Sequence, residues 1–284
     1  MASSPLRSKS YHARSVSLPS RSHPLIPHLD EHLCRLRSSS EATSSSLPSI
    51  SNKLQGLQKL YDCVDDLLLL PHTQQRLGQE CNEKPVEVAL EGYLWLLDTC
   101  AATKDIFSQT KEDVKEQLSI LRRRRDAGDF AGFLASRKKA KKAVLKLLKD
   151  LKSFQNKDKL LALDKDHETV ATFSMLKEVE AITVSALESL LCYALGTNVQ
   201  SRRSGWSLVS KLIHHKRETL QARGTVLSEF EKVDAAVHTP ISIEMVQNQL
   251  GELELGIQVV EEVLESLFRR LVRTRVSLLN ILNK

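Results

Sequence analysis

The chain contains few of the residues on which sheets and tight turns depend. It has 10 glycines and 8 prolines among 284 residues, and aromatic residues make up only 5%. Strands are enriched in aromatic and β-branched residues and turns in glycine and proline, so this scarcity argues against a sheet protein. Leucine, lysine and glutamate are favourable in helices, and their abundance predicts an all-α fold.

The chain also lacks the patterns that identify secreted and membrane-spanning proteins. Its five cysteines are widely spaced and form no C-x-x-C pair, which predicts reduced thiols in an intracellular protein. No apolar run reaches the roughly 18 residues of a membrane-spanning helix, and the N-terminus has no apolar signal-peptide core. We therefore expect no transmembrane segment.

No catalytic or metal-binding pattern stands out. The chain has neither a glycine-rich phosphate loop nor a G-x-S-x-G motif. His28 and His32 have helical spacing, but the segment between them is not the H-E-x-x-H pattern of zinc proteases, and no third ligand is evident. We predict that the protein is not an enzyme, and we expect no catalytic residue, cofactor or metal.

Composition divides the chain into two parts. Residues 1–48 are rich in serine, proline and arginine, with fifteen serines and five prolines in the first fifty positions. Such a segment buries too little apolar surface to offset its ordering entropy, which predicts a mostly disordered leader whose removal leaves the melting temperature nearly unchanged. A short helix near residues 28–36 is compatible with this prediction. Residues 49–284 show helical periodicity, which predicts one elongated bundle of about seven or eight helices.

Proline and glycine punctuate the predicted helices. Pro71 ends one helix, Pro85 and Pro240 each open another, and Gly196 fits the left-handed residue that follows a helix. The expected helical segments are 49–70, 73–79, 85–121 (either continuous or broken near 108–110), 129–155, 166–195, a stretch around 206–213, 217–237 and 240–282.

The leader contains a candidate phosphorylation site. Arg14 stands three residues before Ser17, a spacing that basophilic kinases use to orient their substrates, and Pro19 follows two residues after it. The pattern R-S-x-S-x-P is one that 14-3-3 proteins bind once the second serine is phosphorylated, because their arginines bind the phosphate dianion. It predicts a docking site for 14-3-3 proteins at Ser17.

A second candidate site is a dense run of basic residues. Residues 122–152 carry twelve lysines and arginines against three aspartates. The two clusters that predict a patch for an anionic partner or for nuclear import are Arg122, Arg123, Arg124 and Arg125, followed by Arg137, Lys138, Lys139, Lys141 and Lys142.

Three interpretations of this patch remain open. It resembles a bipartite nuclear-import signal, it has the charge to bind anionic lipid with Lys146, Lys149 and Lys152 extending it, or it is a solvated face balanced by acidic helices. Phosphate contacts with nucleic acid are also electrostatically favourable, but no aromatic residues are interleaved for stacking on bases, which argues against sequence-specific recognition.

Several segments together resemble a plant-specific family of helical proteins related to the BYPASS proteins. The resemblance rests on Ser15–Pro24, Leu96–Asp98 with Lys111–Asp113, Leu121–Arg125 with Arg137–Lys139, Leu176–Ala181 and the arginine- and leucine-rich segment Leu267–Leu282. It implies a role in root and shoot development, where BYPASS proteins restrain a mobile root-derived signal. It supplies no catalytic residues.

These observations predict a helical adaptor or regulatory protein that binds proteins or membranes and is controlled by phosphorylation of its leader. The alternative is an enzyme or carrier that holds a small hydrophobic signalling molecule between helices. A cytoplasmic location is expected, with the nucleus or a membrane surface as further options. Residues 1–29 have four basic residues, eight serines and no acid, so a plastid transit peptide is an alternative for the leader.

Overall fold

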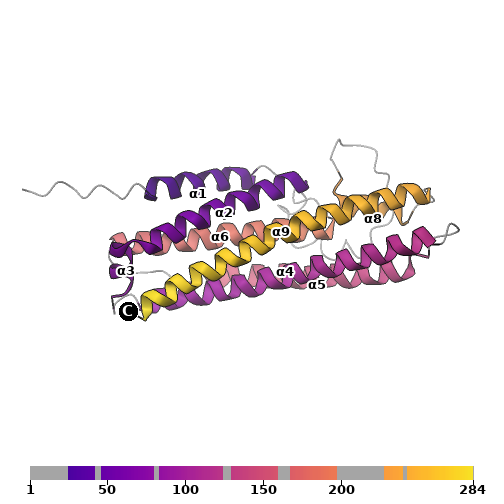
Figure 1. Cartoon of the computed structure of the whole chain (residues 1–284). Coiled ribbons are helices and arrows are strands. Elements are labelled where there is room, and N and C mark those ends of the chain that lie inside the picture. The colour runs from indigo at the N-terminus through magenta and orange to yellow at the C-terminus, as the bar shows by residue number, and fades with distance from the viewer. Residues whose placement is uncertain are drawn as a thin grey trace, which may run out of the picture.

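The protein is an elongated all-α bundle in a computed structural model (Figure 1). The structure describes residues 25–41, 46–79, 83–123, 129–158, 167–196, 227–238 and 242–283, and within these ranges it contains eight helices and no strand. The helices are α1 (Leu25–Glu41), α2 (Leu47–Leu69), α3 (Pro71–Leu77), α4 (Glu83–Arg123), α5 (Ala131–Asp158), α6 (His167–Leu195), α8 (Glu229–Ala236) and α9 (Ile243–Leu282).

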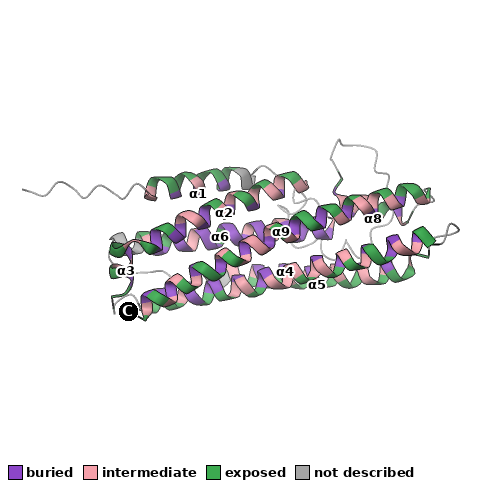
Figure 2. Cartoon of the chain, viewed as in Figure 1, coloured by how far each residue is buried: buried purple, intermediate pink, exposed green. Residues whose placement is uncertain are grey.

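The long helices α2, α4, α5, α6 and α9 run side by side along the axis of the molecule, and α9 packs against both α2 and α4 (Figure 1). Their buried residues face one another across the bundle, while the exposed residues lie outward (Figure 2). The sequence predicted one apolar stripe for the last helix, and all of it is buried except Leu282, which is partly buried. The buried members are Leu250, Leu253, Ile257, Val260, Leu264, Leu267, Leu271 and Leu278.

Helix α1 lies inside the segment that was predicted to be a disordered leader. It packs against α2 and α6, and its apolar stripe of Leu29, Leu33 and Leu36 is buried. These three leucines recur at intervals of four and three residues, which places them on one face of the helix. The packed body therefore begins by residue 25, which corrects the predicted boundary at residue 48.

Helix α4 is continuous through residues 108–110, where the sequence left open whether the helix breaks. The hydroxyl of Thr110 donates to the backbone carbonyl of Ile106 at 2.7 Å, so this polar residue is satisfied within the helix. The hydroxyl of Ser108 donates a hydrogen bond to the carboxylate of Glu261, and this bond connects α4 to α9. Polar residues in this stretch thus connect α4 to its neighbour without ending it.

The helix boundaries agree with most of the predicted signals. Pro71 opens α3 directly after α2 has ended, and Gly196 follows α6 with a φ of 73°, the left-handed conformation that glycine adopts without strain. The helix expected around 206–213 lies outside the described residues, as do residues 217–226 of the segment expected over 217–237. In the described remainder of that segment, Glu229–Ala236 is helical.

None of the helices in the described ranges is long and apolar enough to cross a membrane. Four cysteines are free thiols, and they are Cys34, Cys63, Cys100 and Cys192. Cys81 lies outside the described residues.

Candidate functional site

The predicted basic patch divides between the end of α4 and the first half of α5. Arg122 and Arg123 form the exposed last turn of α4, whereas Arg124 and Arg125 lie outside the described residues. The phosphorylation motif, with Arg14, Ser17 and Pro19, also lies outside them. The second basic cluster lies wholly on α5, where neighbouring residues have very different surroundings.

Arg137 is an internal ion-pairing residue. Its side chain is only 4% exposed, and its Nε and Nη2 each donate to a carboxylate oxygen of Asp234 at 3.0 Å. The guanidinium carbon lies 4.5 Å from the ring centroid of Phe230, a cation–π contact. Lys141 binds the same carboxylate at 2.7 Å. These contacts join α5 to α8, so Arg137 does not belong to an exposed patch.

The charge of Asp234 is stabilised by this arrangement. Burial acts to raise the pKa of Asp234, but the charges and hydrogen bonds of Arg137 and Lys141 outweigh it and hold the pKa below its ordinary value. Asp234 is therefore ionised at neutral pH, and the buried guanidinium of Arg137 keeps a charged partner.

A sequence signal for the burial of Arg137 exists. Arg137 follows Phe133 by four residues and precedes Val144 by seven, so it falls on the apolar stripe of its own helix. Its partner, Asp234, is 97 residues away in the sequence, and no local pattern identifies that pairing.

Five lysines of α5 form an exposed face, which we call the lysine face. Its members are Lys138, Lys139, Lys142, Lys146 and Lys149. With 3.6 residues per turn they fall within about 100° of the helix circumference and extend over about 16 Å. All five are exposed, and none has an ion pair or hydrogen bond with another residue that the structure describes.

The lysine face lies opposite the side of α5 that enters the core. Val144, Leu148 and Leu151 are buried on that side, together with Phe133. Because these residues hold the helix against the bundle, the lysines project outward from a fixed support. The sequence had placed Lys146 and Lys149 only as an extension of the patch, and the structure brings them onto the same face as Lys138 and Lys142.

Two lysines of the neighbouring helix α4 differ from the lysine face in having acidic partners. Lys104 and Lys111 of α4 form ion pairs with Glu265 and Glu261 of α9. The lysine face therefore carries a positive charge that the surrounding helices leave uncompensated.

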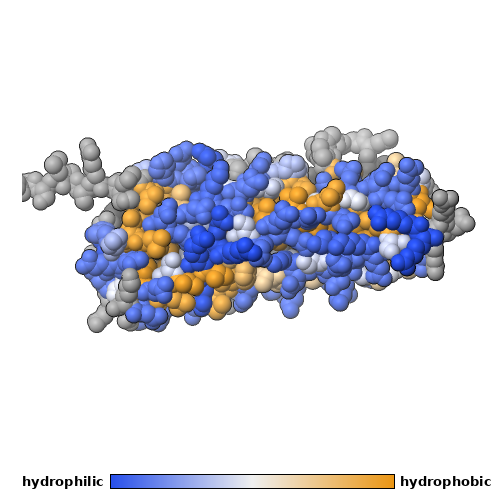
Figure 3. Space-filling view, viewed as in Figure 1, coloured by the Kyte–Doolittle hydropathy of each residue, from blue (hydrophilic) through white to orange (hydrophobic). Residues whose placement is uncertain are grey.

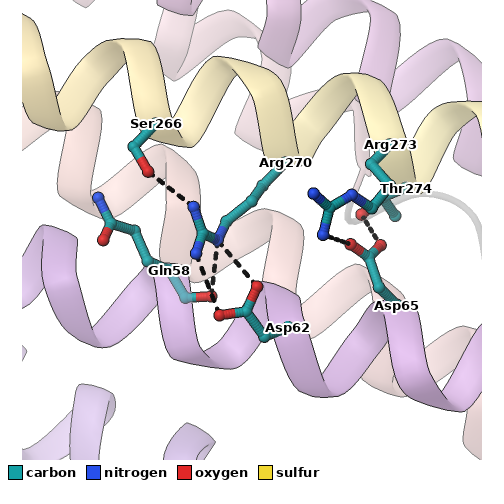
Figure 4. Close-up of polar contacts among 7 residues, drawn as sticks. All are labelled: Gln58, Asp62, Asp65, Ser266, Arg270, Arg273 and Thr274. Carbon is teal, nitrogen blue, oxygen red and sulfur yellow. Dashed lines mark hydrogen bonds and ion pairs between the residues drawn. The ribbon is translucent and has the colours of Figure 1, made fainter.

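The seam between α2 and α9 contains a polar cluster (Figure 4). Arg270 donates through Nε and Nη2 to the two oxygens of Asp62 at 3.0 and 3.1 Å, and it also binds the carbonyl of Gln58 and the hydroxyl of Ser266. All of these groups belong to α2 or α9 and bind one another, so we assign the cluster a structural role in holding the two helices together.

Asp65 continues the same seam at a more deeply buried position. It accepts a hydrogen bond from the hydroxyl of Thr274 at 2.8 Å and lies 3.5 Å from the guanidinium of Arg273 (Figure 4). Burial raises the pKa of Asp65, because the bond from Thr274 and the charge of Arg273 only partly offset the loss of water. This carboxylate fixes the pairing of α2 with α9.

A pocket lies between the end of α4 and the start of α5. It is lined largely by polar and charged residues, including Asp113, Glu116, Arg123 and Asp129. Such a lining does not suit the hydrophobic ligand that the carrier hypothesis requires. Within the described ranges, no group of three or more His, Cys, Asp or Glu side chains lies close enough to bind a metal ion.

The surface along α9 is largely hydrophilic. The face seen in Figure 3 shows hydrophobic areas that are separated by hydrophilic side chains. Leu255 and Val259 are exposed on α9, as are Val272 and Val276 nearer its C-terminus. Two short pairs of this kind are ordinary on a protein surface, and the lysine face is the stronger candidate site.

A family model described as Protein BPS1 matches residues 53–281 of the chain. The matched span runs from the second turn of α2 to the last turn of α9 and includes the whole of α5, while α1 lies before it. No curated protein and no solved structure matches the chain.

Proposed function

The chain belongs to the BPS1 family, as its resemblance to the BYPASS-related proteins predicted, and from this premise we propose that it is a non-enzymatic helical adaptor. In this proposal the lysine face of α5 binds an anionic membrane surface, and the adaptor acts in root and shoot development of plants. The observation that carries the membrane contact is the set of five exposed, uncompensated lysines on one side of a firmly packed helix.

Electrostatics gives this contact a useful strength. A lysine close to an anionic bilayer contributes about 1 kcal/mol, so five lysines together support reversible peripheral binding that salt weakens. A straight helix face matches a flat bilayer, because all five charges approach the surface together. Lipid contact is favoured over nuclear import, since the import interpretation requires Arg137, which is bound to Asp234 inside the bundle.

We further propose that phosphorylation of Ser17 recruits a 14-3-3 protein to the adaptor. Arg14 and Pro19 supply the spacing that supports this step, and the phosphate dianion supplies the charge that the 14-3-3 arginines bind. The phosphorylated peptide should bind a 14-3-3 protein and the unphosphorylated peptide should not. Ser17→Ala should abolish capture, and Ser15→Ala should preserve it.

Liposome sedimentation tests the membrane contact. A variant with Lys138, Lys142 and Lys146 replaced by glutamine should lose binding to vesicles containing phosphatidylserine at low salt. A control with Lys59, Lys84 and Lys115 replaced by glutamine has the same net charge but keeps the lysine face, so it should bind like the unmodified protein.

Equal losses in the two variants would show that only net charge matters and would exclude the lysine face as the site. Binding that persists unchanged at 1 M salt would also contradict an electrostatic contact. A fluorescent fusion of each variant reports its location in the cell and so tests the nuclear-import interpretation. Loss of nuclear signal in the Lys138, Lys142 and Lys146 variant, with vesicle binding intact, would support nuclear import instead.

A further inference from the structure

Helix α1 is attached to the bundle by a small set of contacts. Leu29, Leu33 and Leu36 are buried, and Arg37 forms an ion pair with Glu178 of α6. Leu36 packs closely over Gly56 of α2. A Cβ atom added to Gly56 would lie 2.7 Å from Cδ2 of Leu36. Because α1 has only one buried stripe and sits on the outside of the bundle (Figure 1), modest changes in it can alter its docking.

Ser38 lies on the last turn of α1, on its exposed side. Its hydroxyl donates to the backbone carbonyl of Cys34 at 2.9 Å. Arg35 stands three residues before it, the same spacing that relates Arg14 to Ser17. The guanidinium of Arg35 is exposed, and among the residues that the structure describes it is held only by a surface ion pair with Glu31 at 2.7 Å, so it is accessible to an acidic substrate groove.

We propose that Ser38 is a phosphorylation site of a basophilic protein kinase, and that the phosphate loosens α1 from α2 and α6. In the reaction the Ser38 oxygen forms a bond to the γ-phosphorus of ATP. The bond between that phosphorus and the β,γ-bridging oxygen breaks, ADP leaves, and the hydroxyl proton passes to the catalytic base of the kinase. The site is separate from Ser17 and does not depend on the lysine face.

Three effects of the phosphate disfavour the docked helix. The dianion lies in the last turn, where the helix dipole is negative. The phosphate ester oxygen has no hydrogen to donate, so the hydrogen bond from the Ser38 side chain to the carbonyl of Cys34 is lost and that carbonyl faces negative charge. Glu178, which pairs with the preceding Arg37, adds a further negative charge on α6.

The neighbouring Arg35 offsets these effects only in part. It can reach the phosphate from three residues earlier on the helix, but it must then leave Glu31. Both ion pairs are on the surface, and exchanging one for the other gains little. The balance therefore favours opening of α1, and we expect the open population to rise about fivefold, the size of one unfavourable charge at a helix end.

Phosphorylation of the full chain by the catalytic subunit of a cyclic-AMP-dependent kinase with ATP tests the proposal. The substrate carries Ser39→Ala and Ser40→Ala, so that mass spectrometry assigns the product to Ser38 without ambiguity. We expect phosphate at Ser38, its loss in Arg35→Ala, and about fivefold faster hydrogen exchange in peptides spanning Leu29–Leu36. Absence of phosphate at Ser38, or unchanged exchange in the phosphorylated chain, would overturn the proposal.

Leu33→Ala provides a second test, since a kinase must take the segment around Ser38 into its groove and opening of α1 exposes that segment more often. This variant keeps the Arg35–Ser38 spacing but removes one of the three buried leucines. Phosphorylation at Ser38 should become faster, while the rate at Ser17, which has the same arginine spacing outside α1, should stay the same. An unchanged rate at Ser38, or equal acceleration at both serines, would contradict coupling to the docking of α1.

Discussion

Two adjacent basic residues of α5 differ in burial and in ion pairing. Arg137 is buried and paired with Asp234, whereas Lys138 is exposed without a partner in the described residues. Removing one member of a buried ion pair leaves the other charge without compensation, at a cost of about 3–5 kcal/mol. A change at an exposed site away from such contacts alters stability by about 0.5 kcal/mol or less.

We therefore predict that Arg137→Ala lowers the free energy of unfolding by about 3–5 kcal/mol. Lys138→Ala, one residue away, should change it by at most about 0.5 kcal/mol. Urea unfolding followed by circular dichroism measures both. Similar losses in the two variants would mean that Arg137 is not a buried structural residue.

The same ion pair predicts a dependence on pH. The folded pKa of Asp234 lies below its unfolded value, so the unfolded chain binds the proton more readily. The stabilisation is present above the unfolded pKa of about 3.9 and is lost as the pH falls through the lower folded value. Asp234→Asn should be less stable at pH 7 and should lose less stability than the unmodified protein between about pH 5 and pH 2. Parallel pH profiles in urea unfolding would contradict the lowered pKa.

Residue-level burial could be predicted only in part from the sequence. The position of Arg137 on the stripe of Phe133 and Val144 is readable, but its partner Asp234 is fixed by packing of α8 against α9 and α6. Local spacing cannot supply a contact across 97 residues. For that reason the sequence grouped Arg137 with Lys138 and Lys139, while the structure separates them.

At the scale of elements, two glycines in long helices have opposite roles. A Cβ atom on Gly92 of α4 would lie 2.5 Å from an oxygen of Glu180, a buried residue of α6 that binds Lys177. A Cβ atom on Gly251 of α9 would meet nothing within 4 Å. Gly92 thus allows the close approach of α4 and α6, whereas Gly251 only weakens its helix.

We predict that Gly92→Ala destabilises the protein by about 1–3 kcal/mol, because overpacking displaces the buried carboxylate. Gly251→Ala should stabilise it by about 0.5–1 kcal/mol through helix propensity alone. Thermal unfolding of the two variants compares them directly. Stabilisation by both substitutions would show that the contact between Gly92 and Glu180 relaxes without cost.

Helix α1 changes the expectation for truncation. Removing residues 1–48 deletes the three leucines that α1 buries against α2 and α6. The melting temperature should therefore fall by about 10 °C or more, since each buried leucine contributes about 1.5–3 kcal/mol and each kcal/mol corresponds to about 2–4 °C. Removing only residues 1–24 keeps every contact of α1 and serves as the control. Equal melting temperatures for the two truncated chains would show that α1 adds nothing to the core.

Elements with long apolar stripes were the most predictable. The twelve-residue buried stripe of α9 repeats over many turns and is bounded by clear signals, so its periodicity sufficed. For α1 the sequence indicated at most a short helix over residues 28–36, because its three leucines stand among serines and prolines. The full helix Leu25–Glu41 owes its stability to packing against α2 and α6, which its own composition does not show. Periodicity reports the face of a helix, but it does not report whether another helix covers that face.

At the scale of the whole molecule, the lysine face is a cost to folding. Lys138, Lys142 and Lys146 follow one another at intervals of four residues, and like charges at this spacing destabilise a helix by about 0.2–0.5 kcal/mol per pair. By contrast, Lys104 and Lys111 of α4 each form an ion pair with a glutamate of α9. A surface that keeps an unfavourable cluster is consistent with selection for binding at the expense of stability.

This trade-off predicts that a loss of function at the lysine face is accompanied by a gain in stability. Lys142→Gln removes the central charge and two repulsive pairs, so the free energy of unfolding should rise by about 0.4–1 kcal/mol at low salt. The gain should vanish near 1 M salt, where charges are screened beyond about 3 Å. Lys115→Gln is the control, because Lys115 has an acidic partner in Glu112 and its removal should give no gain. If Lys142→Gln gave the same increase at both salt concentrations, its effect would arise from helix propensity or packing, and the lysine face would carry no electrostatic strain for a membrane to relieve.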